Sequence, residues 1–174
     1  EWNAQSTDWR TGLYAGAQLN GFERQGDFVE MASPALFLRH VSATDWDNAF
    51  INFDQAGWFP APNYVVMKLW HDHYAPQRVE LTGAPDELNA IATLSEDRRT
   101  LYVKVVNTTE QAMHVNVRLP EGFKPHRPNL TIVAPGSLEA RNTLQAPDTV
   151  RPVTHPVTTV EDSKIGRASC RERV

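Results

Sequence analysis

The sequence has almost no cysteine, no long apolar run and no excess of basic residues. Its 174 residues include one Cys, which excludes a disulfide framework and a Cys-rich metal site. No apolar stretch approaches the roughly 18 residues that a membrane helix needs, so we expect no membrane partner. Lys and Arg number 17 against 21 Asp and Glu. This balance argues against a nucleic-acid partner, because proteins that bind nucleic acid usually carry a basic excess.

The two ends of the chain differ from ordinary protein termini. The chain opens on Glu1-Trp2-Asn3, without Met and without a basic-then-apolar leader. The last eleven residues, KIGRASCRERV (164–174), contain the single Cys and resemble translated sequencing-adapter DNA. We therefore exclude residues 164–174 from the predicted fold as an artefactual tail. We also expect the chain to be the back portion of a longer protein.

Residues 1–75 show short apolar runs that alternate with helical patterns. Apolar residues nearly all round a helical wheel predict a buried helix from about residue 9 to 23. The mostly apolar run 28–38 predicts a buried parallel strand and its exit, and Pro34 breaks any regular ladder there. A stripe at helical spacing predicts a second helix over 64–74, with Asn63 as its cap. This order of strands and helices predicts a parallel α/β unit.

Residues 76–163 change to a period of two. Apolar residues alternate with polar ones over 101–105 and again over 113–119, as expected of half-buried strands. Residues 88–94 and 100–106, joined by a polar turn, predict a hairpin. The short strands, polar turns and many prolines predict an antiparallel β-sandwich. The fold class is therefore α/β followed by all-β.

Four motifs in the first segment carry a family resemblance. In order they are Glu-Trp-Asn (1–3), Leu-Asn-Gly-Phe-Glu-Arg (19–24), Val-Glu-Met-Ala-Ser (29–33) and Pro-Asn-Tyr-Val-Val (62–66) near a Lys-Leu. Together they resemble the C-terminal part of family 51 α-L-arabinofuranosidases over roughly residues 1–118. The resemblance implies that residues 1–75 are the last strands and helices of a truncated (β/α)₈ barrel. Residues 76–163 would then form a jelly-roll-like β-sandwich.

The same resemblance implies a function. Enzymes of this family hydrolyse terminal arabinofuranosyl units of arabinan, arabinoxylan and related oligosaccharides, with retention of configuration and without a cofactor. An arabinose-containing saccharide is therefore the expected partner, and the parent protein is expected to be able to form a homo-oligomer.

The catalytic residue implied by the resemblance is Glu1, which stands at the position of the family's nucleophile. A retaining glycosidase needs two carboxyl groups about 5–5.5 Å apart. The family's acid/base Glu lies in an Asn-Glu motif on an earlier strand, and this sequence contains no such motif. We therefore expect the chain alone to be inactive.

Three further residues are candidates for substrate binding. Glu30 lies among apolar residues, so we expect it either to contact the sugar or to form an ion pair, for example with Arg24 or Arg39. Trp2 and Asn3 can line the pocket through an aromatic face and an amide. A core role for Trp2 is the alternative.

Other features leave alternatives open. Trp46 and Trp58 lie in predicted loops, where they either rim the site or shield the structure from solvent. His71 and His73 point to different sides of a helix, so we expect no metal site. A non-catalytic carbohydrate-binding or structural β-module is the alternative function, and another retaining barrel glycosidase is a third.

Overall fold

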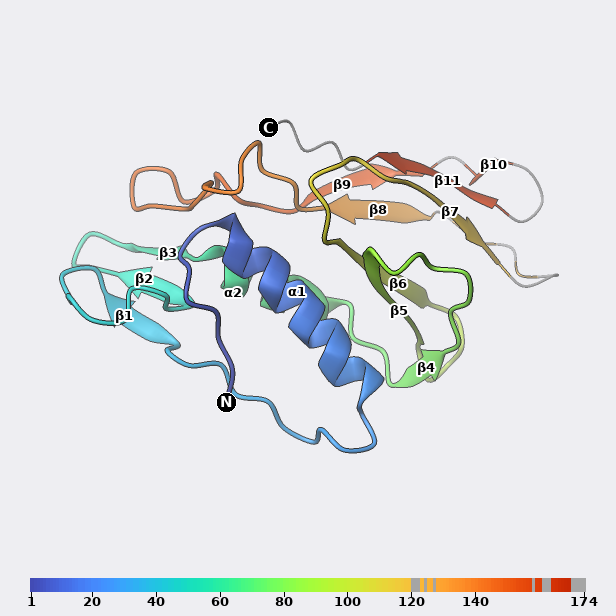
Figure 1. Cartoon of the computed structure of the whole chain (residues 1–174), viewed down its shortest axis with the longest axis horizontal. Helices are drawn as coiled ribbons and strands as arrows, with labels where there is room; N and C mark the ends of the chain where they lie inside the picture. Colours follow the sequence, from blue (N-terminus) through green and yellow to red (C-terminus); the bar gives the residue numbers. More distant parts are fainter. Residues whose placement is uncertain (120–122, 124, 127, 158, 161–163, 170–174) are drawn as a thin grey trace.

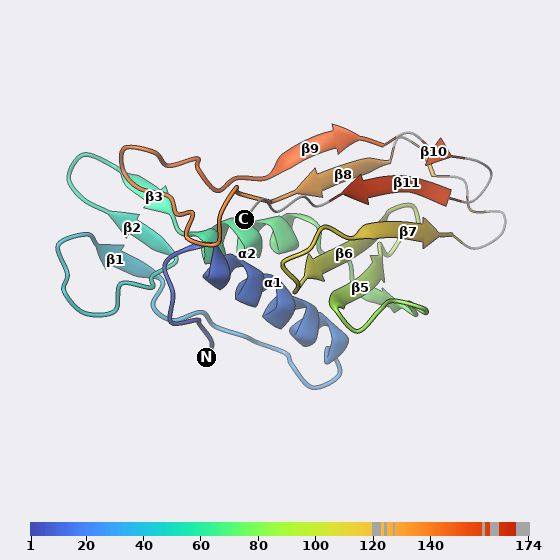
Figure 2. The same cartoon turned by 45° about the horizontal axis from the view of Figure 1, so that its top comes forward.

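The computed structural model describes residues 1–119, 123, 125–126, 128–157, 159–160 and 164–169. In chain order its elements are α1 (Trp9–Arg24), β1 (Leu38–His40), β2 (Ile51–Phe53), β3 (Trp58–Pro60), α2 (Pro62–Asp72), β4 (Gln77–Val79), β5 (Leu88–Leu94), β6 (Leu101–Asn107), β7 (His114–Arg118), β8 (Asn129–Ile132), β9 (Val153–Pro156), β10 (Thr159–Val160) and β11 (Lys164–Ser169). The two helices lie between the small sheet β1–β3 and the strands of the second half (Figures 1 and 2).

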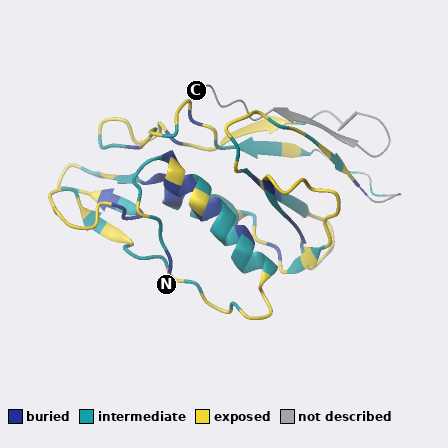
Figure 3. Cartoon of the chain, in the orientation of Figure 1, coloured by how far each residue is buried: buried dark blue, intermediate teal, exposed yellow. Residues whose placement is uncertain are grey.

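Helix α1 confirms the first predicted helix. Asp8 caps it, since its carboxylate accepts a hydrogen bond from the backbone N–H of Arg10 at 3.1 Å. The helix packs on α2, β5 and β6. Its buried positions include Ala15, Gly16 and Asn20, whereas Tyr14 is 43% exposed. Helix α1 is therefore buried on one side and not all round, which corrects the predicted pattern (Figure 3).

Glycine lets α1 approach its neighbours closely. A Cβ atom on Gly16 would lie 2.8 Å from Cγ2 of Val106 in β6, whereas a Cβ atom on Gly21 would meet nothing within 4 Å. We expect Gly16→Ala to lower the free energy of unfolding by about 1–2 kcal/mol through overpacking. Gly21→Ala should raise it by about 0.5–1 kcal/mol through helix propensity. Urea denaturation measures both values, and a more stable Gly16→Ala variant would contradict the close packing.

Helix α2 confirms the second predicted helix but not its cap. Pro62 occupies the first turn, where its fixed φ is already helical, and Ala61 is the N-cap without a side-chain hydrogen bond. Asn63 therefore lies inside the helix and is 1% exposed. Its Nδ2 donates to Oδ1 of Asn3 at 3.2 Å, so this side chain joins α2 to the start of the chain.

The predicted buried strand over residues 28–38 is wrong for most of its length. The N–H groups of Phe28 and Val29 both donate to the carbonyl of Gln25 at 2.9 Å, so the chain is still turning after α1. Phe28 and Met31 are 84% and 85% exposed. Regular pairing begins at β1, which runs parallel to β2, and β2 runs antiparallel to β3. Apolar composition alone did not establish burial here.

The second half is antiparallel, as the period of two predicted. Strands β5 and β6 form the predicted hairpin, in register from Leu88 opposite Asn107 to Leu94 opposite Leu101. Strand β4 pairs with β5, and β8 pairs with β9. The packing of these sheets as a sandwich, and a boundary near residue 75, stay predictions.

The backbone of residues 164–169 forms β11, which pairs with β7 and with β10. An open strand edge accepts main-chain hydrogen bonds from any extended segment. The adapter origin of residues 164–174 stays a prediction.

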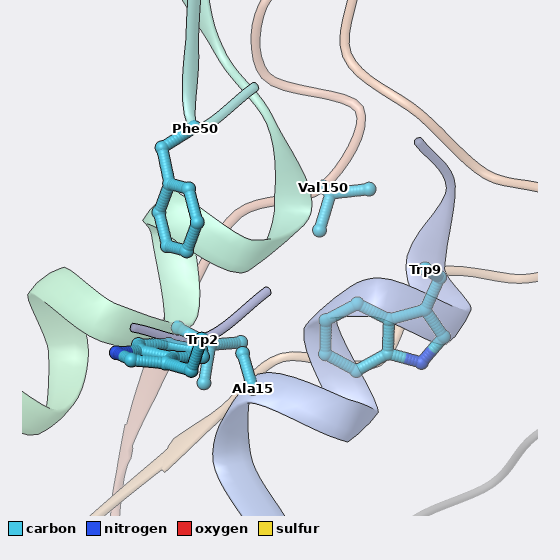
Figure 4. Close-up of a cluster of buried hydrophobic side chains, with 6 residues drawn as sticks. Trp2, Trp9, Ala15, Phe50 and Val150 are labelled. Carbon is cyan, nitrogen blue, oxygen red and sulfur yellow. The ribbon is translucent and has the colours of Figure 1, made fainter. Parts of the chain in front are cut away.

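One hydrophobic cluster joins the start of the chain to the loop before β9. Six buried residues form it, namely Trp2, Trp9, Ala15, Phe50, Val66 and Val150 (Figure 4). Val150 comes from the loop before β9. The buried Asn142 holds it there, donating to the carbonyl of Val150 at 3.1 Å and accepting from its N–H at 2.7 Å.

A polar contact joins α1 to the hairpin β5–β6. Nζ of Lys104 on β6 donates to Oε1 of Glu23 on α1, and the two side chains are only 6% and 15% exposed. Burial lowers the pKa of Lys104, and the hydrogen bond that Lys104 donates to Glu23 opposes that effect. Beside this pair, Nδ2 of Asn20 donates to the carbonyl of Asn89 at 2.9 Å. The interface is therefore held by buried polar groups as well as by packing.

Candidate functional site

Glu1 is exposed at the start of an extended segment. The next residue, Trp2, forms a parallel bridge with Pro34. The N–H of Trp2 donates to the carbonyl of Ser33 at 3.0 Å, and the N–H of Ala35 donates to the carbonyl of Trp2 at 3.1 Å. The backbone that carries Glu1 is therefore fixed beside residues 33–35, while its carboxylate is open to solvent.

Trp2 lies in the hydrophobic cluster, which is the core role left open by the sequence. Its ring meets Phe50 edge-on at 5.4 Å between centroids and Phe22 at 5.8 Å. The ring is 8% exposed, and its Nε1 atom is buried without a hydrogen-bond partner among the described residues. Burying this ring anchors the residue that follows Glu1. A contact between Trp2 and a sugar stays a prediction.

Asn3 uses its amide inside the protein. Its Nδ2 donates to the carbonyl of Asn48 at 2.9 Å, and its Oδ1 accepts from the N–H of Ala4 at 2.8 Å and from Nδ2 of Asn63. In return, Nδ2 of Asn48 donates to the carbonyl of Ala4 at 2.5 Å. These bonds tie the segment after Glu1 to α2 and to the loop before β2. A contact between Asn3 and the substrate stays a prediction.

Glu30 is exposed and lies in a bend, not in a strand. The expected ion pair is not formed in the described structure, because Arg24 donates to Asn89 and Ala90 and Arg39 donates to the carbonyl of Ala43. Glu30 precedes the bridged Pro34 by four residues, whereas Glu1 precedes Trp2 by one. The two carboxylates are therefore not opposite each other along the paired segments. A sugar contact by Glu30 stays a prediction.

Sequence reasoning missed Asn48 and gave Asn63 the wrong role, that of a helix cap. Both are buried, at 9% and 1% exposure, and both bind the segment that follows Glu1. The only sequence signal was an amide beside apolar residues, as in Asn48-Ala49-Phe50, because a buried amide must find a hydrogen-bond partner.

The described residues show no metal or membrane feature. Within that part of the chain, no three His, Cys, Asp or Glu side chains gather closely enough to hold a metal ion. Neither of its helices has the length and apolar character needed to cross a membrane. Chemically, the arrangement places the carboxylate of Glu1 on a backbone fixed by a buried ring and an amide network.

Comparison with known proteins gives a family. The family model described as "Alpha-L-arabinofuranosidase C-terminal domain" matches residues 1–170. Alpha-L-arabinofuranosidase A of Aspergillus kawachii is 29% identical over 147 residues, which are 82% of this chain and 22% of that protein. The extracellular exo-alpha-L-arabinofuranosidase of Streptomyces chartreusis is 30% identical over 88 residues, which are 49% of this chain and 11% of that protein. The chain thus spans less than a quarter of the length of these relatives.

Solved structures agree with the family match at the level of the fold. The alpha-L-arabinofuranosidase from Thermotoga maritima, solved with arabinose, superposes with a TM-score of 0.80 at 21% identity, covering 98% of this chain and 38% of that chain. The chain is therefore a small, sheet-rich portion with the fold of the C-terminal part of that structure. Together with the family model, these findings confirm the resemblance to family 51: the chain belongs to the α-L-arabinofuranosidase C-terminal domain family.

Proposed function

We propose that this chain supplies the nucleophile segment and the C-terminal domain of a retaining α-L-arabinofuranosidase. The parent protein hydrolyses terminal arabinofuranosyl residues of hemicellulose or arabinan. The observation that carries the proposal is the family match over residues 1–170. It includes Glu1, whose carboxylate is exposed on a backbone fixed beside residues 33–35.

In the proposed reaction Glu1 acts as the nucleophile. Its carboxylate attacks the anomeric carbon, while an acid/base carboxyl group on another segment of the parent protein protonates the leaving oxygen. The same group then removes a proton from water, which attacks the anomeric carbon and releases Glu1. The two inversions give net retention. Trp2 and Asn3 hold Glu1 in place through the contacts described above.

We further propose that residues 1–75 complete a (β/α)₈ barrel and that residues 76–163 form the sandwich beside it. The exposed side chains of Phe28 and Met31 support the first part. They lie just before the residues that pair with Trp2, and large exposed apolar groups mark surfaces that other protein segments cover.

A hybrid enzyme tests this function. The part of the Thermotoga maritima enzyme that precedes its matched segment is joined to residue 1 of this chain. We expect the folded hybrid to release arabinose from an aryl α-L-arabinofuranoside, and the 174-residue chain alone to release none. A hybrid with cooperative unfolding and no such turnover would contradict the proposal, as would turnover by the chain alone.

A further inference from the structure

Trp46 combines wide exposure with an unfavourable backbone. Its side chain is 67% exposed, and its φ is +54°. The left-handed region is rare for a bulky residue, and glycine would occupy it without a steric penalty. Residues held in such conformations cluster at active sites and ligand clamps, since surrounding contacts must maintain them. The exposed indole of Trp46 is therefore a candidate for contact with a ligand.

The loop of Trp46 is fixed to the segment that carries Glu1. Two residues after Trp46, the buried Asn48 exchanges hydrogen bonds with that segment: Asn3 donates to its carbonyl, and its amide donates to the carbonyl of Ala4. Asn3 follows Glu1 by two residues. The loop of Trp46 is therefore anchored at the C-terminal end of the extended segment that begins at Glu1. In a parallel barrel this is the end at which catalytic residues sit.

The neighbours of Trp46 favour a polyhydroxylated ligand over an apolar partner. Asp45 and Asp47 flank it and are both exposed. An indole face packs against the C–H groups of a sugar ring, while carboxylates accept hydrogen bonds from hydroxyl groups. Trp58 offers a contrast, because it is also exposed, at 59%, but lies in β3 opposite Phe53 and has no such anchor to the Glu1 segment.

We propose that Trp46 is a sugar-stacking residue that holds an arabinofuranosyl unit beside Glu1. The proposal rests on the proposed function, because it takes the substrate class from there, and it adds a binding residue to that site. The left-handed backbone of Trp46 sets the direction of the indole, and the Asn3–Asn48 contact holds the loop in register with Glu1.

The indole N–H signals of the 174-residue chain test the proposal. The five tryptophans give separate ¹⁵N–¹H signals, which Trp→Phe variants assign. We expect millimolar α-1,5-linked arabinotriose to shift the Trp46 signal saturably and to leave Trp58 in place. Cellotriose, a hexose chain of the same length, should shift it less. Backbone N–H signals of residues 45–48 should shift with the same saturation, and this shift should be lost in Trp46→Gly. Glycine relieves the left-handed strain at this position, so the melting temperature of the variant should not fall.

Each result bears on Trp46 alone. An unmoved Trp46 signal at millimolar arabinotriose overturns the proposal, and so does an equal response to cellotriose or a response confined to Trp58. The activity of the hybrid enzyme is measured separately, so an active hybrid with an unmoved Trp46 signal removes this residue from the site and leaves the proposed function intact.

Discussion

Replacing Glu1 by Ala in the hybrid enzyme should lower turnover of an aryl arabinofuranoside by about 10⁵-fold. Removing a nucleophile abolishes the covalent route, and losses of this order follow when a catalytic unit is broken. The affected side chain is exposed, so folding should be unchanged. Initial rates at saturating substrate measure the effect, with a thermal melt as the folding check.

Glu30→Gln is the matched control. Glu30 is also an exposed carboxylate, but three further residues of chain separate it from the position of Glu1. A solvated carboxylate outside the reacting pair should change turnover less than about tenfold, even where it contacts the sugar. The assignment of Glu1 fails if the two variants lose comparable activity.

Removing one partner of the buried Glu23–Lys104 pair should give the largest loss of stability. The variant Glu23→Leu leaves the Lys104 ammonium in a site where its side chain is 6% exposed. An unpaired buried charge costs about 3–5 kcal/mol. Replacing both partners, as in Glu23→Leu/Lys104→Met, removes both charges. The free energy of unfolding should then return to within about 1 kcal/mol of that of the unsubstituted chain. Urea denaturation of the single and double variants measures the coupling.

The exposed pair Lys68–Asp72 on α2 provides the control. Its atoms are 2.5 Å apart, and the side chains are 56% and 44% exposed. Breaking it with Asp72→Ala should cost less than about 0.5 kcal/mol, as for other exposed pairs four residues apart on a helix. Equal losses from the two pairs would show that burial does not set the strength of the α1–β6 contact.

The pH dependence gives a second readout of Lys104. Because burial lowers its pKa in the folded chain, the unfolded chain binds this proton more tightly. Stability should therefore rise with pH from the lowered pKa toward the ordinary value of 10.5. This rise should be absent from the double variant, in which no ammonium is buried.

Hydrophobic periodicity and turn residues predicted the helices and the hairpin, whose formation depends on residues close together in the sequence. Helix α1 and the hairpin β5–β6 were found because their periods and turns lie within a few residues of each other. The Lys104 side chain shows the limit. Alternation along β6 says nothing about which face α1 covers, so only the tertiary packing shows that Lys104 is buried against Glu23.

The sequence predicted only the part of the candidate site that lies in one short motif. The motif Glu1-Trp2-Asn3 was visible, but the partners of Asn3 are Asn48 and Asn63, 45 and 60 residues further along the chain. No local signal predicts such a contact. The stretch that begins at Phe28 misled the prediction because Phe28 and Met31 are exposed in this chain, although the composition of the stretch is that of a buried strand.

Covalent labelling gives the most direct test that Glu1 is the nucleophile. In the hybrid, the acid/base Glu of the Thermotoga maritima part is changed to Gln, and a dinitrophenyl α-L-arabinofuranoside is added. Dinitrophenol leaves without protonation, so the first step still forms the ester between Glu1 and arabinose. Hydrolysis of this ester needs the missing base to activate water, so the ester should accumulate. We expect mass spectrometry to find one arabinosyl unit on the peptide that contains Glu1. An arabinosyl unit on any other peptide, or rapid release of dinitrophenol with no labelled protein, would show that Glu1 is not the nucleophile.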